Sequence, residues 1–87
     1  MTSQEEIQLK KLKDNLLVTL GEKVQQLRES KGLSQVDLAG KMIGKFDTTN
    51  ISRIESGRTN PTIFTLFRIA EALEIPLNEI LVIETLK

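Results

Sequence analysis

Apolar residues in this 87-residue chain recur every three or four positions in short segments, and each segment is bounded by a glycine, a proline or a capping residue. This spacing gathers apolar side chains on one side of a helix, whereas a half-buried strand would need them at alternate positions. The sequence therefore predicts a compact all-α domain of about five helices, over residues 3–31, 34–43, 47–56, 60–73 and from residue 76 onward.

Capping residues mark the helix boundaries. Ser34 is followed three positions later by Asp37, so the two can form a capping box at the start of the second helix. Asn60 and Pro61 are typical of a helix start and predict the beginning of the fourth helix. Gly21 interrupts the apolar pattern of the first segment, which is therefore either one long helix or two pieces.

Cysteine and histidine are both absent from the sequence. A disulfide framework is excluded, and neither a zinc site nor the usual catalytic nucleophile and base is expected, so we predict no cofactor, no metal and no enzymatic activity. No apolar run reaches the ~18 residues that span a bilayer, and residues 1–10 are polar rather than signal-like. The chain is therefore expected in the cytoplasm.

The net charge is zero, but the charges are unevenly distributed. Residues 1–68 contain eleven Lys and Arg against eight Asp and Glu, whereas residues 69–87 contain one Lys against four Glu. An acidic C-terminal end is repelled by a polyanion, and the more basic remainder is attracted to it. This distribution permits nucleic-acid binding by one side of the molecule.

The stretch DTTNISRIESG, residues 47–57, contains only two apolar residues, Ile51 and Ile54. If both face inward, helical spacing leaves a polar outer face. Arg53 on that face can donate paired hydrogen bonds to guanine, and threonines can contact base edges or the methyl group of thymine. Such a face suits DNA reading, although a helix exposed only to water would look similar. The outer-face residues are Thr48, Thr49, Ser52, Arg53 and Ser56.

The sequence closely resembles the lambda-repressor and Cro-like helix-turn-helix family, also called the XRE family, in LRESKGLSQVDLAGKM (residues 27–42) and NISRIESGRTNPTIFTLFRIAEALEIPLNEIL (residues 50–81). The resemblance covers about residues 18–81 and implies a five-helix domain whose third helix lies in the DNA major groove. It also implies an N-terminal helical extension, residues 1–17, before a helix-turn-helix domain with a C-terminal dimerisation segment, residues 18–87.

The resemblance implies roles for individual residues. Arg28 and Glu55 would pair and tie the first helix to the third, which neutralises a carboxylate that phosphates would repel. Gln35 would meet the DNA backbone and brace a base-reading side chain. The expected base-reading residues are Thr48, Thr49, Asn50, Ser52 and Arg53. The expected phosphate contacts are Ser34, Gln35, Lys45, Arg58 and Asn60.

The link between the second and third helices departs from the family pattern. Twelve positions separate Ala39 from Ile51, which makes the link two residues longer than that pattern. Either the turn bulges, or the second helix gains part of a turn. In both cases, the register of Thr48 and Thr49 against the bases stays undetermined by one residue.

Two residues of this longer link have alternative interpretations. Phe46 is predicted to fill the core, because a buried aromatic ring contributes more stability than an exposed one. The alternative is a contact with thymine methyl groups or the DNA sugar edge. Lys45 beside it is expected to contact phosphate. A lysine that is simply exposed to water in a loop would explain the sequence equally well.

The C-terminal stretch IPLNEILVIETLK, residues 75–87, has more apolar residues than one helix face needs. Leu77 and Leu81 are predicted to cover the domain's own core, and the surplus predicts an interface. A two-fold dimer would present two recognition helices ~34 Å apart to a palindromic operator. Alternatively, the surplus packs under the N-terminal extension, or residues 80–85 form a strand between subunits. The expected dimer residues are Ile80, Val82, Ile83 and Leu86.

The predicted function is a homodimeric, sequence-specific transcriptional regulator that binds double-stranded DNA at a palindromic operator. No membrane contact and no small-molecule ligand are expected. The alternative is an antitoxin-type module whose main partner is a toxin protein, since this scaffold serves several biological settings.

Overall fold

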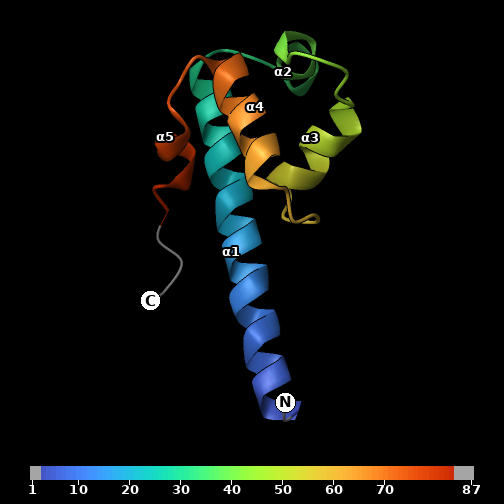
Figure 1. The fold of residues 1–87 in the computed structure, drawn as a ribbon, viewed down its shortest axis with the longest axis vertical. Coiled ribbons are helices and arrows are strands. Elements are labelled where there is room, and N and C mark those ends of the chain that lie inside the picture. The colour runs from blue at the N-terminus through green and yellow to red at the C-terminus, as the bar shows by residue number, and fades with distance from the viewer. Residues whose placement is uncertain (1–2, 84–87) are drawn as a thin grey trace.

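The computed structural model describes residues 3–83, which form five α-helices and no strand (Figure 1). The helices are α1 (Ser3–Ser30), α2 (Gln35–Lys41), α3 (Thr48–Glu55), α4 (Ile63–Leu73) and α5 (Leu77–Leu81). The all-α prediction is confirmed. The alternative of a strand at residues 80–85 is wrong for residues 80–83, while residues 84 and 85 lie outside the described part. No helix within residues 3–83 is long and apolar enough to cross a membrane.

α1 is one continuous helix, so Gly21 does not divide it. A β-carbon at Gly21 would lie 2.5 Å from the carbonyl oxygen of Glu55, and closer still to that of Ile54. Both oxygens belong to the last turn of α3. Only a residue without a β-carbon lets the two backbones approach this closely, so Gly21 is a packing residue.

The first half of α1 projects away from the domain, and the other four helices gather around its second half (Figure 1). Every residue from 3 to 16 is exposed, and the first buried residue of the helix is Leu17. The molecule is therefore elongated, with principal extents of 44 × 24 × 19 Å.

The core is a single cluster to which all five helices contribute. Burying a Val, Leu or Ile side chain contributes ~1.5–3 kcal/mol, so these residues supply most of the stability of a small domain. The largest fully buried side chains are Val24, Leu38, Ile51, Ile69, Leu73 and Ile80.

The orientation of α5 differs from the prediction. Ile80 is fully buried in the core of its own chain, whereas Leu81 is 43% exposed and Leu77 is half-buried. The assignment of Ile80 to a dimer surface is therefore wrong, because its side chain already packs inside the monomer. Leu77 and Ile80, three positions apart, face the core, in place of the predicted Leu77 and Leu81.

The capping box of α2 is formed as predicted. The Ser34 hydroxyl accepts a hydrogen bond from the Asp37 N–H at 3.0 Å, and the Asp37 carboxylate accepts one from the Ser34 N–H at 2.9 Å. The start of α4 differs, because Thr62 rather than Asn60 is its N-cap and accepts from the Thr65 N–H at 3.1 Å. α4 therefore begins two residues later than Asn60 and Pro61 suggested.

Candidate nucleic-acid interface

α3 presents a polar face to solvent. Ile51 is fully buried and Ile54 is 3% exposed, so the narrow apolar edge of the helix faces the core as predicted. Asp47 caps the N-terminus by accepting a hydrogen bond from the Thr49 N–H at 3.1 Å. Thr48 is half-buried. The predicted base-reading residues that stand exposed on α3 are Thr49, Asn50, Ser52 and Arg53.

A buried hydrogen-bond network holds α3 in place. The Arg28 guanidinium of α1 donates from Nε to Glu55 Oε2 at 2.7 Å and from Nη2 to Glu55 Oε1 at 3.0 Å. Its Nη1 donates to the Leu33 carbonyl at 2.6 Å, which also ties the α1–α2 link. Gln35 of α2 donates a further bond to Glu55 Oε1 at 2.9 Å. One carboxylate thus joins α1, α2 and α3.

The predicted pairing of Arg28 with Glu55 is present in this network, and both residues are buried, at 7% and 6% exposed. The hydrogen bond from Arg28 to Glu55 raises the pKa of the guanidinium above its ordinary value. Paired charges in a buried site need partners for their remaining polar atoms. That need is met here, because no buried side-chain nitrogen or oxygen within residues 3–83 lacks a hydrogen-bond partner.

The longer link between α2 and α3 bulges rather than lengthening α2. α2 ends at Lys41, and the chain then turns through Gly44, which has a left-handed φ of 80°. Arg68 of α4 holds the bulge, donating from Nη2 to the carbonyls of Ile43 at 2.8 Å and Lys45 at 3.3 Å. The additional residues are therefore accommodated before α3 begins at Thr48.

Phe46 packs against the core from the end of this link. The Arg68 guanidinium lies over its ring, with the central carbon 5.1 Å from the ring centroid. This placement matches the interpretation of Phe46 as a core residue, while its half-exposed edge lies beside Asn50 in a shallow recess. Lys45, next to it, is exposed and lines an adjoining recess with Phe46 and Asn50.

The remaining predicted phosphate contacts flank α3. Arg58 and Asn60 are exposed in the loop that follows the helix, and the Arg58 N–H donates to the Arg53 carbonyl at 2.9 Å. Ser34 is exposed beside the N-terminus of α2, where its hydroxyl oxygen accepts from the Asp37 N–H. The amide of Gln35 is directed at Glu55, so within the free protein it braces the network.

Two contacts at this site were not predicted from the sequence. Arg68 lies in an apolar helix, with no local pattern that connects it to a loop more than twenty residues away. Gln35 was assigned to the DNA backbone, and only the fold places its amide beside the carboxylate of Glu55. Both contacts join residues distant in sequence, and periodicity carries no information about such pairs.

A short polar helix, fixed by a buried network against a second helix and flanked by exposed Lys and Arg, defines a DNA-binding domain of the helix-turn-helix class. The sequence matches the family HTH_3, described as Helix-turn-helix, over residues 24–80. The chain belongs to this family, and the predicted resemblance is confirmed.

Known relatives and structures agree with this assignment. A protein of Sinorhizobium fredii named as an uncharacterized HTH-type transcriptional regulator, y4dJ, is 36% identical over 56 residues, which are 64% of this chain and 70% of that protein. The crystal structure of the restriction-modification controller protein C.AhdI from Aeromonas hydrophila matches with a TM-score of 0.68 and 34% identity, over 74% of this chain and 94% of that one.

A second solved structure is an HTH_3 family transcriptional regulator from Vibrio cholerae, with a TM-score of 0.69 and 29% identity over 77% of this chain and 37% of the other. The five-helix arrangement is thus that of known helix-turn-helix regulators. Two of the three proteins are named as transcriptional regulators and the third as a controller protein, and this chain is a member of the same helix-turn-helix regulator family.

Proposed function

We propose that the protein is a sequence-specific transcriptional regulator that binds a palindromic operator as a homodimer, with α3 in the major groove. The observation that carries the proposal is the exposed polar face of α3, since the one carboxylate within the helix, Glu55, is buried against Arg28. A face of this kind can approach base edges without repelling phosphates.

Within this proposal, Arg53 is the main base reader, since an exposed arginine can donate two hydrogen bonds to guanine. Thr48, Thr49, Asn50 and Ser52 read or flank neighbouring bases. Thr48, which is half-buried, has the least freedom of these side chains to reach a base. The proposed phosphate contacts are Ser34, Gln35, Lys45, Arg58 and Asn60.

The position of α5 supports a dimer. α3 and α5 lie on opposite sides of the molecule across its 24 Å extent (Figure 1). Two copies joined on the α5 side would carry their recognition helices at the outer edges, and each copy needs to supply about half of the ~34 Å between half-sites. Val82 is 68% exposed and Ile83 is half-buried on this side, while Leu86 lies outside the described residues.

Selection of bound sites from random DNA tests this function, and the expected result is an inverted repeat with half-sites about one helical turn apart. Recovery of sequences with no common motif would overturn the proposal of sequence-specific binding, and recovery of single half-sites would overturn the palindromic dimer.

A further inference from the structure

An apolar stripe runs along the exposed half of α1. Leu9, Leu12 and Leu16 are 49, 50 and 43% exposed. At ~100° per residue, the three side chains fall within about 60° of one another around the helix. No residue between 3 and 16 is buried, so the described part of the chain does not cover the stripe.

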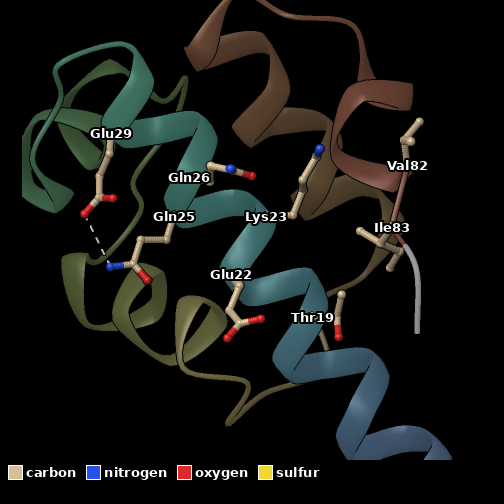
Figure 2. Close-up of a pocket in the computed structure, with 8 residues that line it drawn as sticks. All are labelled: Thr19, Glu22, Lys23, Gln25, Gln26, Glu29, Val82 and Ile83. Carbon is tan, nitrogen blue, oxygen red and sulfur yellow. Dashed lines mark hydrogen bonds between the residues drawn. The ribbon is translucent and has the colours of Figure 1, made fainter. Parts of the chain in front are cut away.

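The stripe faces the α5 side of the molecule and points away from α3. Gly21, which touches α3, lies about 140° around the helix from Leu16, whereas Lys23 lies only about 20° from it. Lys23 lines the recess in which α1 faces Val82 and Ile83 (Figure 2). The stripe therefore lies on the same side of α1 as Val82 and Ile83, which follow α5.

α5 alone is too small to hold a dimer together. A stable interface buries ~800 Å² per partner and involves about 20 to 30 residues a side, but α5 has five residues. Leu81 and Val82 add exposed apolar surface at 43% and 68%. The exposed half of α1, residues 3–16, adds a further ~21 Å of helix along the same side.

The charges around the stripe are complementary to a second copy placed antiparallel. Glu5 and Glu6 lie in the first turn of α1, before the stripe. Lys23 lies seven residues after Leu16, on the same side of the helix. An antiparallel pair centred between Leu12 and Leu16 brings the acidic turn of each copy beside Lys23 of the other. A parallel pair would instead place Glu5 beside Glu5 and Lys23 beside Lys23 along the stripe, and like charges repel.

We propose that Leu9, Leu12 and Leu16 form a self-association surface that pairs antiparallel with the same stripe of a second copy, continuing the surface of Leu81 and Val82. This inference rests on the proposed dimer and identifies what holds it together. It also gives a role to the exposed half of α1, which lies before the family match at residues 24–80.

Sedimentation equilibrium of the full chain tests the inference. The variant L9Q/L12Q/L16Q keeps helix-forming residues and leaves the buried core unchanged, and we expect its dimer dissociation constant to rise roughly 100-fold. Ile7→Gln is the matched control, because Ile7 is 56% exposed but lies on the opposite side of α1. Its dissociation constant should stay that of the unmodified chain. Equal dimerisation of the triple variant and the unmodified chain would overturn the inference.

DNA binding separates this inference from the proposed function. The triple variant should still prefer the operator half-site as a monomer, so loss of self-association with retained base preference supports both proposals. A triple variant that stays dimeric but loses DNA affinity would overturn the inference, since the stripe would then contact DNA. An unmodified chain that binds all DNA sequences equally would overturn the proposed function alone.

The absence of cysteine allows the orientation to be tested directly. When Glu5→Cys and Lys23→Cys chains are mixed and oxidised, antiparallel pairing predicts a mixed disulfide as the main product. Disulfides formed only between identical chains would overturn the antiparallel arrangement.

Discussion

Gly21 of α1 lies against the last turn of α3 so closely that a β-carbon at this position would stand 2.5 Å from the carbonyl oxygen of Glu55. The obstacle is backbone on both sides, so it cannot be relieved by a side-chain rotation. The position of α3, and with it the orientation of the proposed reading face, therefore depends on the absence of a side chain in α1.

We expect Gly21→Ala to destabilise the protein by about 3 kcal/mol, at the upper end of typical overpacking costs, because α1 and α3 must separate. Urea unfolding measures this change, and operator affinity should fall with it. Gly40→Ala is the matched control, since Gly40 lies in α2 with open space around it. That change should stabilise the protein by ~0.5–1 kcal/mol. Equal effects of the two substitutions would contradict the packing role of Gly21.

Arg28→Ala should cost about 3–5 kcal/mol of unfolding free energy, because it leaves the carboxylate of Glu55 buried without its cation. Gln35→Ala removes a single hydrogen bond to the same carboxylate at 2.9 Å and should cost only ~1–2 kcal/mol. Thermal or urea unfolding of the two variants gives the comparison. A smaller loss for Arg28→Ala than for Gln35→Ala would show that the network does not depend on the ion pair.

The features predicted correctly are those encoded by neighbouring residues. The capping box needs only Ser34 and Asp37, and the inward face of α3 needs only the spacing of Ile51 and Ile54. The pairing of Arg28 with Glu55 followed from the family resemblance, because nothing local connects residues 27 positions apart.

The features predicted wrongly depend on how helices approach each other. α5 has barely more than one turn, so spacings of three and four residues are equally compatible with an inward face, and the packed core selects Ile80 over Leu81. The start of α4 is similar, because Asn60 was the predicted cap, whereas the Thr62 hydroxyl is the group that accepts a hydrogen bond from the helix. The link was left open between a bulge and a longer second helix, and the bulge that forms is held by Arg68, which reaches it from another helix.

Arg53→Ala should weaken operator binding by ~1–3 kcal/mol and relax the preference at one base pair, if Arg53 reads a guanine. Lys45→Ala and Arg58→Ala should weaken binding to all sequences and reduce the salt dependence by about one phosphate contact each. Titrations of operator and scrambled DNA at several salt concentrations distinguish the two classes. Unchanged base preference for Arg53→Ala would remove its proposed role.

Glu74 ends α4 in the left-handed conformation, with a φ of 58°, which a residue with a β-carbon adopts at a cost. Glu74→Gly should therefore stabilise the protein by ~1 kcal/mol, since glycine reaches this region without strain. Glu71→Gly, inside α4, removes the same charge and should destabilise by a similar amount, about 1 kcal/mol. Two destabilised variants in thermal unfolding would contradict this account of the helix end.

The backbone N–H of Ser34, followed by its hydroxyl, holds the pKa of Asp37 below its ordinary value. A carboxyl whose pKa is lower in the folded state contributes stability above its unfolded pKa of about 3.9, and loses that contribution as the pH falls through the folded pKa. Asp37→Asn should therefore be less stable than the unmodified chain at pH 7, and the difference should shrink below about pH 4. Urea unfolding of both chains across this range measures it, and a difference that grows on acidification would contradict the role of the charged cap.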